Sequence, residues 1–157
     1  MAKMDMFSNV DVDIALSNEL YANGMDQNGL SVDMQGFESV VFEILAGVLA
    51  TAGDTDGTYV LYLQEADEDP NNPGVPGAYT AVDQNFIQGG NFPADVAGKI
   101  LEIDGTDADE RDSVYWFGYV GSKRFIRLQM DVSAVTNGMP LGAIATKGNP
   151  HSAPVSA

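Results

Sequence analysis

The sequence predicts an all-β protein: a single β-sandwich or barrel-like domain of about seven or eight short antiparallel strands, with extended N- and C-terminal arms. Three observations predict this class. Several segments alternate apolar and polar residues with the period of a strand, turns rich in glycine and aspartate separate them, and helical periodicity is scarce. The 157 residues, 45% of them hydrophobic, are enough to bury one core.

The first 30 residues are expected to form an arm outside the domain. Their best helical pattern, at residues 13–23, matches a helix poorly and fits an arm or a short turn better. The opening residues lack the continuous apolar run of a signal peptide, and no stretch approaches the roughly 18 apolar residues of a membrane span. We therefore expect a soluble protein that is made in a cytoplasm.

The β domain is expected over residues 31–146. Its first clear strand, at residues 39–47, places Val40, Phe42 and Ile44 on one face. Further strands are expected at residues 58–65, 78–83, 99–104, 114–120, 123–132 and 141–146. The stretch between the second and third strands holds three of the seven prolines, so it is an exposed loop. Residues 147–157 form a polar tail without structure of its own.

The strands at 114–120 and 123–132 are expected to pair as a hairpin that turns at Gly121-Ser122. A run of apolar residues at alternate positions marks the buried face of the second strand: Ile126, Leu128, Met130 and Val132. The turn region also carries three of the seven basic residues, namely Lys123, Arg124 and Arg127, in a chain of formal net charge −16. This small basic group, framed by aromatic residues, is the most unusual feature of the sequence.

Residues suited to catalysis are scarce. The single histidine, His151, lies in the tail, and the chain has no cysteine, so neither a Ser/His nor a Cys/His pair is available. We expect no enzymatic activity and no cofactor. Two acidic turns offer oxygen ligands for calcium, one with Asp54 and Asp56, the other with Asp104, Asp107 and Asp109. Neither turn matches a calcium-binding loop, and we interpret both as ordinary turns without a metal.

The large negative charge argues against nucleic acid as a partner, because a polyanion repels it at long range. The glycine-rich segments also lack the spacing and the strand-to-helix context of a phosphate-binding loop. No membrane partner is expected.

Three short motifs occur in order along the chain: "LQEADED" after a strand, then "GYVGSKRFIRL", then "GNPHSAP" near the end. Together with the early segment "GLSVDMQGFESVVFEI", this pattern resembles a family of small structural proteins of tailed-phage virions, over residues 30–154. The resemblance implies a β-sandwich-like virion protein, and specifically a decoration, or cement, protein on the outer surface of the capsid. Its partner would then be the major capsid protein, and a homo-oligomer is expected, with a trimer as the working hypothesis.

On this interpretation the basic group is an assembly seam formed by Lys123, Arg124 and Arg127 with Trp116 and Tyr119. Arg124 and Arg127 would meet carboxylates of a neighbouring subunit or of the chain's own arms. Residues 1–23 and 147–157 are expected to be flexible in solution and ordered on the particle.

Two alternatives stay open. The first is another virion component, such as a head–tail connector or a tail- or fibre-associated protein. The second is a β module that binds carbohydrate or a cell surface through exposed tyrosine and tryptophan, with calcium held in the acidic turns.

Overall fold

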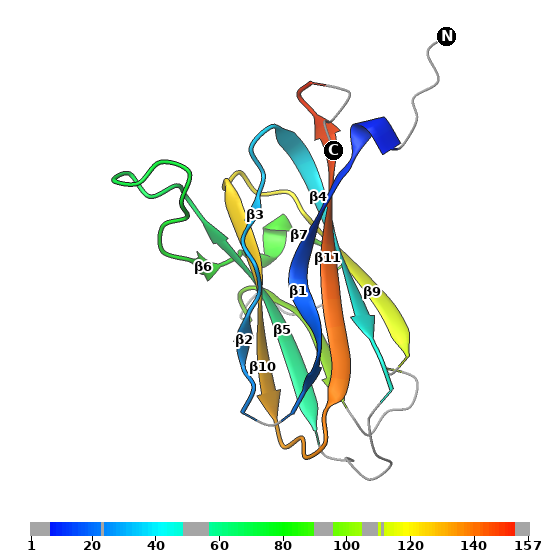
Figure 1. Cartoon of the computed structure of the whole chain (residues 1–157). Coiled ribbons are helices and arrows are strands. Elements are labelled where there is room, and N and C mark those ends of the chain that lie inside the picture. The colour runs from blue at the N-terminus through cyan, green and yellow to red at the C-terminus, as the bar shows by residue number, and fades with distance from the viewer. Residues whose placement is uncertain are drawn as a thin grey trace.

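The computed structural model describes residues 7–22, 24–48, 57–89, 96–104, 110 and 112–152. Eleven strands in these ranges form two antiparallel sheets that pack face to face (Figure 1). Sheet A has the order β1-β11-β4-β9-β7. In sheet B, β10 and β5 pair along their whole length, with β2 and β3 on the free side of β10 and with β6 and β8 on the free side of β5. The predicted all-β sandwich is confirmed.

The strands differ widely in length. Sheet A comprises β1 (Asp11–Tyr21), β4 (Phe37–Ala46), β7 (Ile87–Gln88), β9 (Ser113–Tyr119) and β11 (Met139–Pro150). Sheet B comprises β2 (Gln27–Asn28), β3 (Val32–Asp33), β5 (Thr58–Ala66), β6 (Thr80–Ala81), β8 (Lys99–Asp104) and β10 (Phe125–Ser133). Two 3-10 turns, η1 (Phe7–Asn9) and η2 (Gln84–Phe86), complete the described elements. The expected number was lower because β1 and three strands of only two residues, β2, β3 and β7, were not anticipated.

The core lies between the sheets and follows the alternation in the sequence. Val40, Phe42 and Ile44 of β4 are buried as predicted, and so is the apolar row of β10. Beside β10 in sheet B, the buried row of β5 consists of Tyr59, Leu61 and Leu63, and these two rows face that of β4. Each such side chain contributes roughly 1.5–3 kcal/mol on burial, so these facing rows hold the two sheets together.

The predicted N-terminal arm is wrong for residues 11–21, which form β1 and pair with β11 at the edge of sheet A. The strand escaped the pattern search because its register shifts twice, between Ile14 and Leu16 and between Leu16 and Glu19. Consequently the neighbouring Ala15 and Leu16 are both buried, which breaks the period of two.

The C-terminal boundary also differs from the prediction. β11 continues to Pro150, so residues 147–150 belong to the sheet and not to an unstructured tail. The expected flexibility of the arms therefore does not apply to the two segments that form β1 and the end of β11. The remaining parts of the expected arms, residues 1–6 and 153–157, lie outside the described residues.

The predicted hairpin of β9 and β10 is also wrong. β9 pairs with β4 in sheet A, whereas β10 pairs with β5 in sheet B, so residues 120–124 cross from one sheet to the other. Gly121 makes this crossover possible: a Cβ atom there would lie 2.2 Å from the hydroxyl oxygen of Tyr119. The buried face predicted for β10 is nevertheless correct, because both strands turn their apolar side toward the same core.

The proline-rich segment between β5 and β6 projects from one end of the sandwich (Figure 1). Its backbone is hydrogen-bonded to itself, from Asp69 N to Val75 O (2.8 Å) and from Gly77 N to Asp67 O (2.8 Å). The prediction of an exposed loop is confirmed, and we call residues 67–77 the projecting loop.

Candidate functional site

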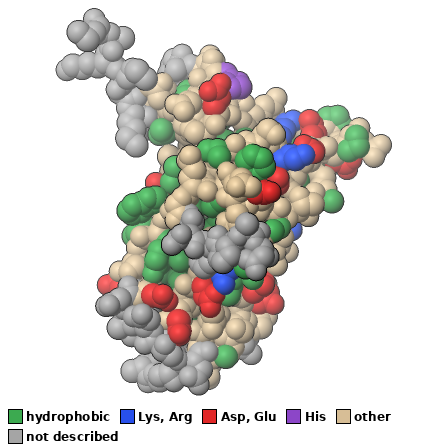
Figure 2. Space-filling view, turned by 180° about the vertical axis from the view of Figure 1, so that it is seen from behind, with side chains coloured by type: hydrophobic (Ala, Val, Ile, Leu, Met, Phe, Trp, Pro, Cys, Tyr) green, Lys and Arg blue, Asp and Glu red, His purple; other side chains and the backbone are tan. Residues whose placement is uncertain are grey.

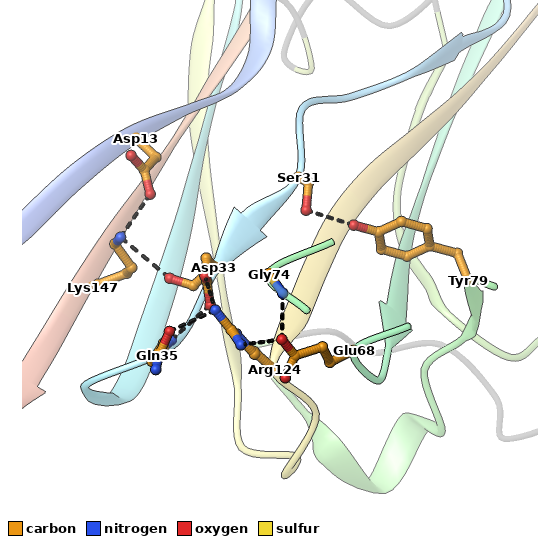
Figure 3. Close-up of polar contacts among 9 residues, drawn as sticks. All are labelled: Asp13, Ser31, Asp33, Gln35, Glu68, Gly74, Tyr79, Arg124 and Lys147. Carbon is orange, nitrogen blue, oxygen red and sulfur yellow. Dashed lines mark hydrogen bonds and ion pairs between the residues drawn. The ribbon is translucent and has the colours of Figure 1, made fainter. Parts of the chain in front are cut away.

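Arg124 is the centre of a polar network at the end of the sandwich from which the loop projects (Figure 3). Its Nε and Nη2 atoms donate to the two carboxylate oxygens of Asp33 at 2.9 and 2.8 Å, and Nη2 also donates to the amide oxygen of Gln35 at 2.5 Å. Nη1 lies 2.9 Å from a carboxylate oxygen of Glu68, which in turn accepts a hydrogen bond from the backbone N–H of Gly74. Arg124 thus ties the projecting loop to β3.

Lys123 and Tyr119 hold the crossover beside this network. Lys123 Nζ is 2.5 Å from a carboxylate oxygen of Asp67, at the base of the projecting loop. The hydroxyl of Tyr119 donates to Glu65 of the opposite sheet (2.5 Å) and accepts from the backbone N–H of Lys123 (3.1 Å). Burial, together with the hydrogen bond to Glu65, raises the pKa of the Tyr119 hydroxyl well above its usual value. Both residues therefore act within the chain.

Lys147 closes the same end of the sandwich from the side of sheet A. Its ammonium group lies 2.8 Å from a carboxylate oxygen of each of Asp11 and Asp13, and it donates to the backbone carbonyl of Asp33 at 3.3 Å. Burial alone would lower the pKa of Lys147, but the two carboxylates outweigh burial, and the pKa is raised. We call this group the charged end, defined by Asp11, Asp13, Asp33, Glu68, Arg124 and Lys147.

The carboxylates of the charged end are stabilised in their ionised form. The hydrogen bonds from Arg124 lower the pKa of Asp33, and the hydrogen bond from Lys147 lowers that of Asp11. The carboxylates that Arg124 meets belong to its own chain. These carboxylates balance the charge of Arg124 without a neighbouring subunit. A role for Arg124 in an interface stays a prediction.

Arg127 lies apart from this group, on the outer face of sheet B. Its Nε atom donates to the amide oxygen of Gln64 (2.8 Å), and the guanidinium stacks over the ring of Tyr79, 4.0 Å from its centroid. Gln64 donates in turn to Gln129 at 2.6 Å. Arg127 thus contacts amide and aromatic groups, and its predicted part in an interface is likewise untested.

A hollow of about 500 Å³ lies between the β3–β4 turn and the crossover, and Tyr119, Lys123 and Arg124 are among the residues that line it. His151 also borders it, exposed, with Nε2 3.6 Å from a carboxylate oxygen of Glu38. The polar groups of Tyr119 and Arg124 are already engaged in the contacts described above. Chemically, the hollow offers a polar surface and not a nucleophile with an adjacent base.

Trp116 has a different environment from the other predicted residues, because it lies on the outer face of sheet A with 68% of its surface exposed. Five aliphatic side chains of β1, β4 and β9, with β11 between β1 and β4, share that face and are also exposed: Val12, Ile14, Val41, Leu45 and Val114. We call these six residues the apolar face. Figure 2 shows hydrophobic side chains along the side of the molecule where β9 lies, while the basic groups sit among acidic ones near the projecting loop.

The part of the chain that the structure describes holds no candidate metal cluster and no membrane-spanning helix. No group of three or more His, Asp or Glu side chains there is arranged to hold a metal ion, and no helix there is long and apolar enough to span a membrane. The candidate calcium turns fall mostly outside these ranges, since Asp54, Asp56, Asp107 and Asp109 are not among the described residues. Asp104 is described and ends β8.

Comparisons of the chain with protein-family models and with curated proteins found no match. The functional interpretation therefore depends on the geometry of this chain and on the resemblance of its motifs.

Several residues of the charged end and of the apolar face were not predicted from the sequence. Lys147 occupies a core-facing position of β11, on the same side of the strand as Met139, Leu141 and Ala143. A lysine that follows apolar residues at alternate positions predicts a buried ion pair, because lysine is almost never buried without a partner. The partners of Lys147 stand at alternate positions of β1, which was not expected to be a strand. The apolar face was missed because its members come from separate strands whose order in the sheet the sequence does not state.

Proposed function

We propose that this chain is a structural protein of a tailed-phage virion that decorates the assembled head. It binds the outer surface of the capsid through the major capsid protein and stabilises the shell, without catalysis and without a cofactor. A protein that binds the assembled shell but not the free subunits raises the stability of the shell by mass action.

The observation that supports this proposal best is the apolar face. Soluble proteins rarely expose a large contiguous apolar patch unless it binds another molecule. Here, six exposed apolar side chains lie on one face of one sheet, and the strands beneath them are rigidly paired. An exposed apolar face on a continuous sheet suits a protein whose function is to adhere to another protein.

The contacts of Arg124 and Lys123 within the chain support the same proposal. Arg124 and Lys123 hold the projecting loop and the crossover in place, so they give shape to the molecule. A projecting loop with three prolines and internal hydrogen bonds is a second rigid feature that a partner could contact. Self-association, including the trimer, remains part of the proposal, to be checked by light scattering of the purified chain.

The test is mass spectrometry of purified virus particles with a count of copies per particle. Decoration predicts hundreds of copies, because capsids present many equivalent sites. Heads assembled without the chain should lose resistance to heat and to low salt and regain it when the purified chain is added. Six to twelve copies would favour a connector or tail component instead, and absence from the particle would refute a virion role.

One observation favours a second candidate, a carbohydrate-binding module. Trp116 lies directly opposite Glu43 in the β4–β9 pairing, and an exposed indole beside a carboxylate can stack on and hydrogen-bond a sugar. Saturable quenching of the Trp116 fluorescence by oligosaccharides would support that function. An unchanged spectrum, together with binding to heads, would favour decoration.

A further inference from the structure

We infer that the apolar face docks a partner protein that places an apolar side chain in a hollow beside Leu45 and a lysine or arginine against Glu43. This inference rests on the proposed function, in which the partner is the capsid shell, and it specifies the chemistry of the contact. It also assigns an energetic role to individual residues of the face.

The register of sheet A fixes how the face is built. One row crosses four strands in the order Ile14, Ile144, Glu43 and Trp116. The next row on one side holds Val12, Thr146 and Val41, and the next on the other side holds Gly142, Leu45 and Val114. Glu43 therefore lies between Ile144 and Trp116, with Val41 and Leu45 on the same face of its own strand.

A hollow of about 530 Å³ opens in this face beside Leu45 and Val114, where Asn18 lies against Gly142. Ile14, Leu45, Val114 and Ile144 line it, and Asp112 stands at its border. Interfaces gain most of their affinity where an apolar anchor fills such a pocket and water is excluded around it. The hollow is therefore the expected socket for one anchoring side chain of the partner.

Glu43 indicates the charge of the partner. It accepts a hydrogen bond from the hydroxyl of Thr146 at 3.2 Å, and no described lysine or arginine pairs with it. A carboxylate covered by a partner needs a matching charge or several hydrogen-bond donors, because burial without them is costly. A basic residue of the partner satisfies this requirement, and the net charge of −16 attracts such a surface at long range.

The same charges argue against a second copy of this chain as the occupant. A two-fold contact centred on the face would bring two Glu43 carboxylates together and would join two chains that each carry −16. Like charges in an interface cost affinity and suppress the pairing. Any self-association of the chain is therefore expected through another surface.

The experiment measures binding of the purified full chain to heads that were assembled in cells lacking its gene. Trp116→Ala and Leu45→Asp should each weaken binding by about 30-fold or more, as expected for anchors of an interface. Glu43→Gln should weaken binding by about tenfold and reduce its sensitivity to NaCl, since a charge pair is removed. Glu43→Lys should weaken it further by repulsion.

Two matched controls lie outside the face. Leu30→Ala removes a side chain of similar exposure (53%) on the connection between β2 and β3, and Glu102→Gln removes a carboxylate from β8 of the other sheet. Both should bind heads as the wild type does. Urea unfolding of every variant verifies that it is folded, so that a loss of binding reports on the face.

Two results of the binding experiment separate this inference from the proposed function. If the wild type binds heads and the Trp116, Leu45 and Glu43 variants bind equally well, the inference is overturned and decoration stands. If the wild type does not bind heads, decoration is wrong, and a photo-crosslinking residue at position 114 in whole virions decides the inference. A crosslink to a lysine- or arginine-bearing segment of another protein supports it, whereas a crosslink to a second copy, or none, overturns it.

Discussion

The charged end and the apolar face both draw on the region from β9 to the crossover, yet their side chains differ in what they contact. β9 contributes Trp116 to the apolar face, and a few residues later the crossover delivers Arg124 to the charged end. At the charged end, each cation meets carboxylates of its own chain. On the apolar face, the large side chains expose between 38 and 68% of their surface to solvent.

This difference separates residues that shape the molecule from residues that are available to a partner. Changes at the charged end should affect stability and the projecting loop. Changes on the apolar face should leave stability almost unchanged and affect binding. The predictions below test this division, beginning with the largest expected effect.

Loss of the buried Lys147 ammonium group should be the most damaging change at the charged end. Its side chain is only 7% exposed, and Lys147→Ala leaves Asp11 and Asp13 facing each other without a cation. The variant should lose about 3 kcal/mol of unfolding free energy in urea. Lys147→Met, which keeps most of the side-chain volume, isolates the contribution of the charge. A loss below about 1 kcal/mol for the alanine variant would show that β1 is held by its ladder alone.

Arg124→Ala should release the projecting loop from the sandwich. The amides of Asp69, Val75 and Gly77, which are hydrogen-bonded within the loop, should exchange with deuterium at least about tenfold faster. Lys123→Ala is the matched control, because it removes a cation that makes a single exposed pair with Asp67, and it should change this exchange less. Equal exchange in all three proteins would show that the prolines and internal hydrogen bonds suffice.

Acid should remove the stabilising contribution of the carboxylates at the charged end. The pKa values of Asp11 and Asp33 are lowered from 3.8, so the folded state binds protons more weakly than the unfolded state. Their stabilising contribution is complete above the unfolded value and is lost as the pH falls through the folded values. Asp33→Asn should therefore be less stable at pH 7 and show a flatter decline of unfolding free energy below about pH 4. An unchanged slope would contradict the assignment.

Trp116→Ala should have the smallest effect on folding. With 68% of the residue exposed, the change in unfolding free energy should stay within about 0.5 kcal/mol. Phe117→Ala, the neighbour that faces the core, should cost about 3 kcal/mol or more and serves as the contrast. A large loss of stability in the Trp116 variant would mean that the indole supports the sheet and that the apolar face is not simply available to a partner.

The fold was largely predictable from alternation, and its exceptions have physical causes. β4, β5 and β10 were located correctly because most of their buried residues repeat every two positions. β1 was missed because its bulges place Ala15 and Leu16 in the core side by side. The pairing of β9 with β10 was wrong because alternation shows which side of a strand is buried and not which strand lies beside it.

The candidate site was predictable only in part. The basic residues and aromatics of residues 113–133 were recognised as unusual, but their partners are distant in sequence. Asp33, which pairs with Arg124, is 91 residues away along the chain. The sequence analysis grouped Trp116 with Tyr119, but the structure separates them. Trp116 is exposed on the apolar face, whereas Tyr119 is buried and its hydroxyl donates a hydrogen bond to Glu65.

By itself, the sequence determined the class of the fold, the buried side of most strands, the acidic character of the molecule and its lack of a nucleophile–base pair. These properties are local or additive, so they can be derived from composition and from a period of two. The tertiary structure alone decided which strands share a sheet, that Lys123 and Arg124 pair with carboxylates of their own chain, and that apolar side chains of separate strands meet on one exposed face. Those properties depend on pairing between distant segments, which is determined by the packing of the whole core.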